Sequence, residues 1–345
     1  MNQLKTGQWN LTDLKDVKPN GKTVFSCFHC GGGSTMGYKL AGYDVLGGVE
    51  IDPEMMSIYR SNHHPKHSYL MGVQEFKNIP NESLPSELFN LDILDGSPPC
   101  SSFSMAGSRE DAWGKNKKFR EGQANQVLDD LFFHFIDIAA KLKPKVVVAE
   151  NVKGLVIGKA KGYVKMIVDQ FDKAGYDVQL FLLNSAFMGV PQKRERTFFI
   201  AKRKDLNFSK LKLMFDETPI TIKTATQNVL NKQFKPITES TKMLWAKCKQ
   251  GKSLRTVHLN GSRFNWSREN INQPCRTFVS TSSNMILHPT EPRPFYDGEK
   301  IRIQTFPDDY NFLKSDVGYV CGMSVPPFMM QRVANQIYKQ WLKNM

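Results

Sequence analysis

Three stretches of the sequence carry side chains that could together do covalent chemistry on an electron-poor ring. The stretch GSPPCSSFS presents Cys100 behind two stiff prolines, and AENVKG places Glu150 at the end of a β-type run. In GVPQKRERTFFI, Arg194 and Arg196 alternate, so an extended backbone turns both to one side. A thiolate can add to a ring carbon, and a carboxylic acid can protonate a ring nitrogen. An arginine can hold a carbonyl oxygen or a phosphate.

Each of these residues also has a purely structural interpretation. A single cysteine such as Cys100 is more often an inert, buried side chain. The carboxyl of Glu150 could be a surface acid or a helix cap, and the two arginines could simply be exposed. Taken together, the set suits attack on an electron-poor ring, protonation of a ring nitrogen and alkylation of the adjacent carbon.

A glycine-rich loop near the N-terminus indicates a nucleoside-type cofactor beside this chemistry. In FSCFHCGGGSTMG, Gly31–Gly33 follow a predicted strand and precede a predicted helix over Ser34–Leu40, whose N-terminus could face a ligand. Glu50 lies 17 residues past Gly33, where an acid can accept hydrogen bonds from a ribose diol. Met36 stands in the third glycine position of the dinucleotide pattern, so that pattern is not matched. A plain tight turn is the alternative.

The same loop contains Cys27 and Cys30 at the spacing of a zinc or redox pair. Zinc needs two further ligands, but the other cysteines are single, and His63, His64 and His67 have no matching spacing. A thioredoxin-like pair lies at a helix N-terminus, whereas three glycines follow here. We therefore expect neither a metal nor a redox pair.

These residues must be positioned by a sheet, because parallel strands present ligand-binding residues beyond their carboxyl ends. Short β-type runs alternate with helical patterns over the first two hundred residues, which predicts a doubly wound, mainly parallel sheet of the α/β class. The predicted strands are Thr23–Ser26, Val45–Glu50, Leu91–Asp95, Val146–Ala149, Val178–Leu183 and Thr197–Ala201. Further helices are predicted over about Gln126–Leu142, over Tyr163–Ala174 and after Pro326–Pro327.

The positive charge is concentrated in one part of the chain. The net charge is +14, and the segment from Lys202 to Arg276 holds 16 Lys and Arg against five Asp and Glu. The alternation of strand and helix patterns becomes less regular in this segment. We therefore predict a second, smaller domain that continues to about residue 285. Clustered lysines and arginines favour a polyanion-binding face, although a solvated basic surface has the same composition.

Composition places the chain among intracellular globular proteins. Its 345 residues are 40% hydrophobic and 23% charged, and the N-terminus has no apolar run typical of a signal peptide. The six cysteines show no disulfide framework, which suits a reducing compartment. We expect a cytoplasmic protein that does not enter a membrane.

The chain resembles the cytosine-C5 DNA methyltransferases over nearly all of its length. SPPCSSFS is similar to the family's PPCQxFS loop, and Glu150-Asn151-Val152 to its ENV motif. Gln192, Arg194 and Arg196 are similar to its QxRxR motif, and CFHCGGG resembles its FxGxGG cofactor loop. Motifs in this order and spacing make the resemblance specific. Segments 293–307 and 322–327 resemble the family's two motifs nearest the C-terminus.

The resemblance implies a Rossmann-like, S-adenosylmethionine-dependent methyltransferase of class I that acts on double-stranded DNA. A target cytosine would be flipped out of the duplex, and Cys100 would attack its C6. Glu150 would hold N3 and the exocyclic amine, Arg196 would hold O2, and Arg194 would position the backbone. The implied cofactor-binding residues are Phe28, Gly32, Gly33, Glu50, Ile51, Gln74, Pro99, Leu131 and Ser324, and the implied DNA contacts are Ser104, Gln192 and Thr277.

The resemblance also implies a division of labour along the chain. Residues 1–202 would form the catalytic and cofactor-binding domain, and the basic segment 203–285 the target-recognition domain. Residues 286–316 would connect it to a C-terminal helix over 317–345 that completes the catalytic domain. The loop from Ser101 to about Gln123 would close over the flipped base. We expect a monomer without a metal, and pairing with a restriction endonuclease stays open.

Four positions depart from the family's motifs. Cys30 replaces the first glycine of the cofactor loop, and Val73 replaces the aspartate expected to meet the adenine amine, with Gln74 as the candidate substitute. Met323 replaces an asparagine, and Ser101 a glutamine after the nucleophile. Three of the four would touch the cofactor pocket, so we predict that S-adenosylmethionine binding is retained but is weaker or differently tuned.

Two other functions are compatible with parts of the pattern. A relative that methylates tRNA typically carries a CFT tripeptide, which is absent here, and does not need so large a basic module. A catalytically silent DNA-binding relative could result from the cofactor-site departures, but Cys100, Glu150 and Arg196 argue against it.

Overall fold

The computed structural model describes residues 8–99, 116–117, 126–127, 130–156, 161–262, 265–280 and 283–345. Within these ranges the chain divides into a larger unit, made of segments 17–183, 195–213 and 333–345, and a smaller unit, made of 8–16, 184–194 and 214–332. Three residues of the predicted site, Cys100, Ser101 and Ser104, lie outside the described residues. Part of the predicted target-recognition segment, 203–213, belongs to the larger unit.

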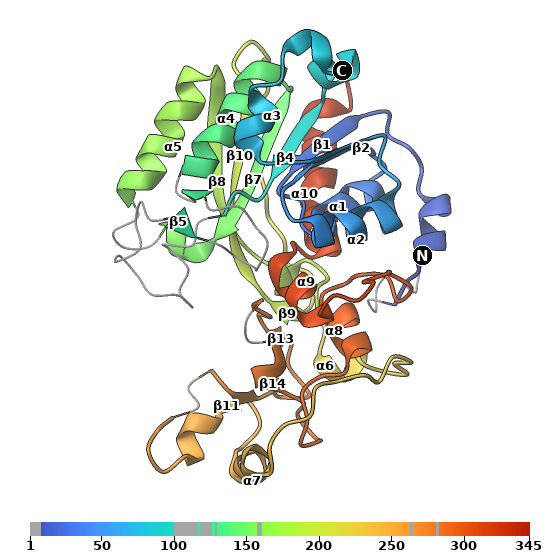
Figure 1. The fold of residues 1–345 in the computed structure, drawn as a ribbon, viewed down its shortest axis with the longest axis vertical. Helices are drawn as coiled ribbons and strands as arrows, with labels where there is room; N and C mark the ends of the chain where they lie inside the picture. The colour runs from blue at the N-terminus through green and yellow to red at the C-terminus, as the bar shows by residue number, and fades with distance from the viewer. Residues whose placement is uncertain are drawn as a thin grey trace. The chain divides into compact units, whose positions relative to one another are not determined.

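A seven-stranded sheet in the order β3-β2-β1-β4-β7-β10-β8 forms the centre of the larger unit (Figure 1). The first five strands of this order are parallel, and β10 runs antiparallel to β7. The predicted doubly wound, mainly parallel sheet is thereby confirmed. The central strands are nearly continuous apolar runs, as expected of strands covered on both faces. The strands are β1 (Thr23–Cys27), β2 (Asp44–Glu50), β3 (His67–Leu70), β4 (Ile93–Gly96), β7 (Val146–Val152), β8 (Tyr176–Asn184) and β10 (Glu195–Arg203).

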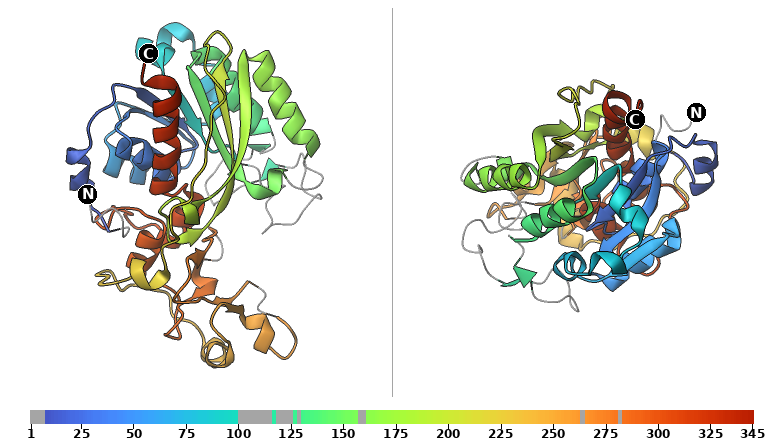
Figure 2. Two further views of the ribbon diagram at one scale, coloured as in Figure 1. Left: turned by 180° about the vertical axis from the view of Figure 1, so that it is seen from behind. Right: turned by 90° about the horizontal axis from the view of Figure 1, so that it is seen from above.

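Helices cover both faces of this sheet (Figures 1 and 2). Phe25 and Cys27 of β1 point into a core that also contains residues of α3, α4 and α5. On the opposite face, Ser26 points towards α1, and the hydroxyl of Tyr43 donates to the carbonyl of Ala334 in the last part of α10. Successive residues of β1 therefore serve opposite layers. The helices are α1 (Gly33–Leu40), α2 (Pro53–His63), α3 (Val73–Lys77), α4 (Leu131–Leu142), α5 (Lys161–Lys173) and α10 (Pro327–Ile337).

Several boundaries differ from the sequence-based expectations. The helix expected from about Gln126 begins only at Leu131, because β6 (Gln126–Val127) pairs with β5 (Asn116–Lys117) as a short antiparallel ladder. Strand β3 was not predicted, because its four residues have no apolar alternation. Helix α2 was not predicted either, although Asp52 caps it and Pro53 occupies its first turn, which are recognised start signals.

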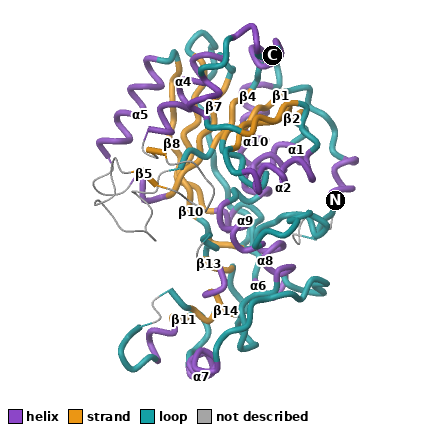
Figure 3. The backbone as a smooth tube through the Cα atoms, viewed as in Figure 1, coloured by secondary structure: helices purple, strands orange, loops and turns teal. Residues whose placement is uncertain are grey.

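The smaller unit contains little regular structure, and loops make up most of its chain (Figure 3). Two small apolar clusters hold it together, one around Phe278 and Phe295 and one around Trp245 and Leu287. A three-stranded sheet has the order β11-β12-β14, and a separate two-stranded ribbon joins β13 to β9. The elements are β9 (Gln192–Lys193), α6 (Ile222–Ala225), α7 (Glu239–Lys247), β11 (Lys252–Ser253), β12 (Ser267–Arg268), β13 (Cys275–Arg276), β14 (Ile286–Leu287), α8 (Asp297–Ile303) and α9 (Val317–Met323).

Candidate active site

The loop between β1 and α1 turns through three residues in the left-handed conformation. The φ angle is 55° at Phe28, 49° at Cys30 and 90° at Gly32. The N–H of Phe28 donates to the Val49 carbonyl at 2.9 Å, and that of Gly32 donates to the His29 carbonyl at 2.8 Å. A glycine adopts such angles freely, whereas another residue pays roughly 1–2 kcal/mol. Two non-glycine residues persist here because the surrounding contacts determine the loop.

The side chains of this loop anchor it to α2. The Sγ of Cys30 lies 3.4 Å from the Sδ of Met55. The buried ring of His29 stacks on Tyr59 with a centroid distance of 3.7 Å, and its Nδ1 lies 2.9 Å from the Cys30 carbonyl. Burial lowers the pKa of His29 to about 4, so the ring is neutral at pH 7. Cys30 therefore fits this loop with its side chain directed towards α2.

Glu50, at the end of β2, collects three backbone donors. Its Oε2 accepts from the N–H of Cys30 at 2.9 Å, and its Oε1 accepts from Ile51 at 2.9 Å and from Asp52 at 3.0 Å. Burial raises the pKa of Glu50 to about 6, although these N–H groups favour the charged form. The carboxylate thus joins the glycine-rich loop to the turn that starts α2.

A second buried acid, Asp95 on β4, was not identified from the sequence. Its Oδ2 accepts from the hydroxyls of Ser26 at 2.7 Å and Ser34 at 2.8 Å, and its Oδ1 from Tyr38 at 3.2 Å. Burial raises its pKa to about 6. Because Ser34 and Tyr38 belong to α1, this carboxylate fixes the helix that follows the glycine-rich loop. Its only sequence signal was an acid within an apolar strand.

Glu150 and Arg196 form a buried ion pair on neighbouring strands. Glu150 lies opposite Phe198 in the antiparallel β7–β10 ladder, so Arg196, two residues from Phe198, shares its face of the sheet. The Nε of Arg196 lies 2.9 Å from the Oε1 of Glu150, and its Nη1 donates to the Glu195 carbonyl at 2.9 Å. Burial lowers the pKa of Arg196, and the charge of Glu150 opposes that shift.

Asn151 connects this pair to the segment that leads to Cys100. Its Nδ2 donates to the carbonyl of Pro98 at 3.0 Å, and its Oδ1 accepts from the N–H of Val152 at 2.8 Å. The side chain is buried, so both of its polar groups are satisfied within the unit. Pro99 is the last described residue before Cys100.

In the smaller unit, Arg194 binds backbone. Its guanidinium donates to the carbonyls of Phe278 at 3.1 Å and Gly322 at 3.0 Å, and only 2% of the residue is exposed. This arginine therefore joins three segments of the smaller unit that are far apart in sequence. The hydroxyl of Thr277, beside them, donates to the Lys193 carbonyl at 2.7 Å.

Gln192 and Ser324 belong to a buried amide network of the same unit. The Nε2 of Gln192 donates to the Oε1 of Gln304 at 3.0 Å, and the Nε2 of Gln304 donates to the Ser324 carbonyl at 2.8 Å. Within the described part of the chain, the buried Oε1 of Gln192 and Oγ of Ser324 have no hydrogen-bond partner. The side chain of Gln192 has no exposed surface, and its contact with DNA stays a prediction.

The other predicted cofactor residues lie at the carboxyl side of the sheet or in the core. Gly33 opens α1, Ile51 follows β2, and Gln74 lies in α3. Leu131 begins α4 and is completely buried beside Phe132 in the main core. A contact between Leu131 and a cofactor stays a prediction.

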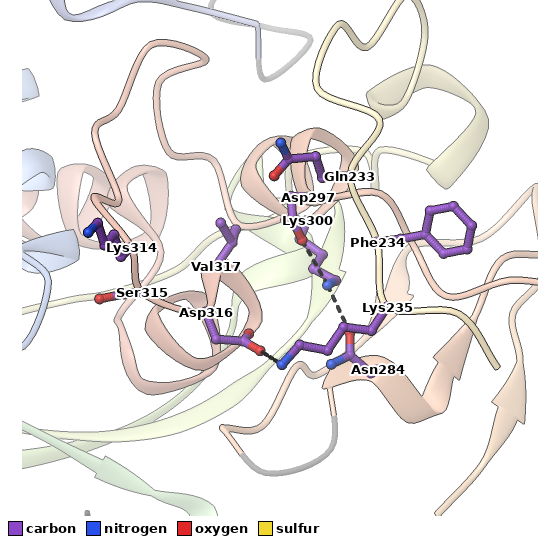
Figure 4. A pocket seen from close by; sticks show the side chains of 10 residues that line it. All are labelled: Gln233, Phe234, Lys235, Asn284, Asp297, Lys300, Lys314, Ser315, Asp316 and Val317. Carbon is purple, nitrogen blue, oxygen red and sulfur yellow. Dashed lines mark hydrogen bonds and ion pairs between the residues drawn. The ribbon is translucent and has the colours of Figure 1, made fainter.

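A pocket of about 320 Å³ lies elsewhere in the smaller unit (Figure 4). Lys235 pairs with Asp316 at 2.6 Å, and Lys300 binds Asp297 at 3.0 Å and Asn284 at 2.9 Å. These pairs use the charges of two of the three lysines that line the pocket, so it presents little uncompensated charge to a ligand.

Across the described ranges, no three His, Cys, Asp or Glu side chains are grouped as metal ligands. Burial raises the pKa of the Cys27 thiol far above its usual range, as expected of a core residue. No described helix combines the length and apolar character needed to cross a membrane.

Comparison with known proteins identifies a family. The profile of the C-5 cytosine-specific DNA methylases matches residues 23–339. The chain is 28% identical to the type II methyltransferase M.NgoPII of Neisseria gonorrhoeae, over 93% of this chain and 96% of that protein. It is 31% identical to the type II methyltransferase M.Sau96I of Staphylococcus aureus, over 87% and 71% respectively.

Solved structures share the fold. A prophage-encoded protein described as a DNA modification methyltransferase (E. coli) superposes with a TM-score of 0.71 at 20% identity, over 93% of this chain and 99% of that one. The Dnmt2 methyltransferase of S. pombe gives a TM-score of 0.65 at 16% identity, over 92% and 98%. The predicted class I methyltransferase fold is confirmed.

Proposed function

Because the chain belongs to the C-5 cytosine-specific DNA methylase family, it is a DNA cytosine-C5 methyltransferase, and we propose that it methylates a cytosine flipped out of duplex DNA. The observation that carries this proposal is the buried Glu150–Arg196 pair. Asn151, the residue next to Glu150, holds the start of the segment that contains Cys100. An acid, an arginine and a thiol are the groups that addition to a cytosine ring requires.

The residues around the glycine-rich loop fit S-adenosylmethionine. Two carboxylate oxygens offer about four acceptor sites, and Glu50 uses three of them for backbone N–H groups, which leaves one for a ribose hydroxyl. In the smaller unit, the buried Oγ of Ser324, a predicted cofactor contact, has no partner among the described residues, as expected of a group that binds a ligand. Gln74 would meet the adenine amine. When bound, S-adenosylmethionine supplies an electrophilic methyl group.

The chain's own residues would carry out the covalent addition and the proton transfers of the reaction. The Cys100 thiolate adds to C6 of the cytosine, while Glu150 gives or shares a proton at N3 and Arg196 holds O2. This addition would leave an electron pair at C5 to accept the methyl group, which the cofactor would supply by breaking its bond to the sulfonium sulfur. A water-derived base then removes the C5 proton, the bond between Cys100 and C6 breaks, and the proton at N3 returns to Glu150. Arg194, which binds two backbone carbonyls, acts as a positioning residue.

Methyl transfer from labelled S-adenosylmethionine to duplex DNA, RNA and tRNA tests this function. We expect activity on duplex DNA only, and its loss in Cys100→Ser. A duplex containing 5-fluorocytosine should trap a covalent adduct at Cys100, because fluorine cannot leave as a proton does. Glu150→Gln should lower the rate by roughly 10²- to 10⁴-fold, the usual contribution of a general acid.

The outcomes separate the proposal from its alternatives. Labelling of tRNA but not of duplex DNA would indicate the tRNA-directed function. Duplex binding without any methyl transfer would indicate a silent DNA-binding protein. Near-normal methylation by Cys100→Ser would exclude the covalent mechanism.

A further inference from the structure

One exposed arginine of the smaller unit is held by an unusual set of buried groups. The side chain of Arg276, on β13, is 48% exposed, yet its Nε lies 3.3 Å from the Oε1 of Glu269, whose side chain is only 4% exposed. The Nη2 of Arg276 donates to the carbonyl of Gly251 at 3.1 Å. An ion pair made by an exposed arginine adds little to the stability of the fold, whereas burying a carboxylate lowers that stability. The arrangement therefore points to a guanidinium whose orientation matters.

Glu269 is itself fixed in place. Its Oε1 accepts from the hydroxyl of Ser267 at 2.8 Å, and its Oε2 accepts from the backbone N–H of Arg276 at 3.1 Å. Burial raises the pKa of Glu269, and the charge of Arg276 opposes the shift. One carboxylate thus binds both the backbone and the side chain of the same arginine.

The backbone of Arg276 is held by pairing with a neighbouring strand. Strand β13 pairs with β9, with Arg276 opposite Lys193 and the buried Cys275 opposite Gln192. The N–H of Cys275 donates to the Pro191 carbonyl at 2.9 Å. A side chain carried by such a ribbon is positioned more precisely than one on a loop.

Polar groups that could meet DNA surround this arginine. The exposed Lys193 donates from Nζ to the Oε1 of the exposed Gln273 at 3.1 Å, which leaves the amide N–H groups of Gln273 directed elsewhere. The Nε and Nη2 of Arg276 are engaged by Glu269 and Gly251, and no acceptor among the described residues lies within hydrogen-bond distance of its Nη1. A guanidinium with outward N–H donors matches the O6 and N7 acceptors of guanine in the major groove.

We infer that Arg276, oriented by Glu269 and the Gly251 carbonyl, reads a guanine in the target sequence of this methyltransferase. The inference rests on the proposed function. Glu269 acts as a positioning residue, and Lys193 supplies a neighbouring charge for phosphate. A phosphate contact alone would not need a fixed guanidinium plane, because a phosphate accepts donors from many directions.

A library of duplexes with randomised bases around a cytosine tests the inference. Methylated products are sequenced after bisulfite treatment to give a base preference at each position. We expect one position with a strong guanine preference in the unchanged protein. Arg276→Lys keeps the positive charge but loses the planar guanidinium that can donate two parallel hydrogen bonds. It should therefore reduce the guanine preference by roughly 5- to 150-fold at that position only. Glu269→Gln should reduce it at the same position, by less.

Two variants serve as controls. Arg255→Ala removes another exposed arginine of the same unit and should leave this guanine preference unchanged. Lys193→Met should weaken binding to all sequences alike and flatten the dependence of affinity on salt.

The possible results distinguish the inference from the function. If the unchanged protein transfers no methyl group to duplex DNA, the proposed function is wrong. If it does, but no position prefers guanine, or Arg276→Lys keeps the full preference, only the inference is wrong. If Arg276→Lys is inactive because it does not fold, the guanine preference of Glu269→Gln still decides.

Discussion

At the scale of single residues, the cofactor loop shows how a side chain can replace a glycine. Cys30 has a φ angle of 49° and keeps its N–H on Glu50, while its sulfur lies against Met55. Backbone strain at Cys30 and obstruction of a ligand by its side chain are therefore two separate effects. The sequence predicted weaker S-adenosylmethionine binding because of this cysteine. The effect of its strained backbone can be tested separately from the effect of its side-chain bulk.

We expect Cys30→Gly to change the dissociation constant of S-adenosylmethionine by less than about threefold, because the side chain is directed towards α2. Cys30→Val should weaken binding at least tenfold, since a β-branched residue tolerates a positive φ poorly. Isothermal titration calorimetry measures both. Cys30→Ala controls for the loss of sulfur. A large gain in affinity for Cys30→Gly would show that the cysteine obstructs the pocket.

The buried Asp95 predicts a pH dependence of stability. Its pKa in the folded protein is about 6, against 3.8 for an ordinary aspartate, so the folded state holds this proton more tightly. The contribution of this group to stability is full below about pH 4 and is lost as pH rises through about 6, by up to roughly 3 kcal/mol.

Asp95→Asn removes this titration and retains an acceptor for Ser26 and Ser34. The unfolding free energy of the unchanged protein minus that of Asp95→Asn should therefore be larger at pH 4.5 than at pH 7.5. Urea unfolding at the two pH values measures it, and the contribution of Glu50 cancels in the difference. An equal difference at both values would contradict the assigned shift.

At the scale of elements, neighbouring strands β4 and β7 lead to the two halves of the proposed chemistry. The segment that leads to Cys100 leaves the end of β4, and Asn151 of β7 holds it through the Pro98 carbonyl. The described residues just before Cys100 are thus held by a strand that is far from them in sequence.

We expect Asn151→Ala to slow the trapping of 5-fluorocytosine DNA at least tenfold and to lower stability by about 1–3 kcal/mol, because a buried carbonyl loses its donor. Asn62→Ala is a matched control, since Asn62 is also buried and donates to a backbone carbonyl, that of Ile58. It should cost similar stability without slowing the trapping. If trapping slows equally in both variants, Asn151 contributes to the stability of the fold and not specifically to the reaction.

The sequence predicted the elements whose pattern is local. Six predicted strands occur, because apolar runs bounded by turn residues are read directly from the chain. The four residues of β3 owe their conformation to pairing with β2, which no local pattern contains. Asp95 was missed for a related reason, since its partners lie on β1 and α1. The alternation of Arg194 and Arg196 predicted a shared side, but only tertiary contacts place one on backbone carbonyls and the other on Glu150.

At the scale of the whole molecule, charge governs the encounter with DNA. The net charge of +14 includes +11 between Lys202 and Arg276, so phosphate contacts should dominate the affinity. We expect the association constant for a non-target duplex to fall by about 10³-fold or more between 50 and 200 mM salt, as for proteins with 6–10 phosphate contacts. Fluorescence anisotropy measures this. A slope near zero would show that the charge faces solvent and not DNA.

The chain passes between its two units five times, and residues 333–345 return to the unit that begins at residue 17. The Tyr43 hydroxyl depends on Ala334, and the Lys22 ammonium on the carbonyl of Met345. During synthesis, therefore, the sheet can emerge from the ribosome long before its last covering helix is available. A nascent chain stopped before residue 333 would hold every catalytic motif yet lack part of the packing around them. During translation, the proposed catalytic residues are therefore synthesised before the fold around them can be completed.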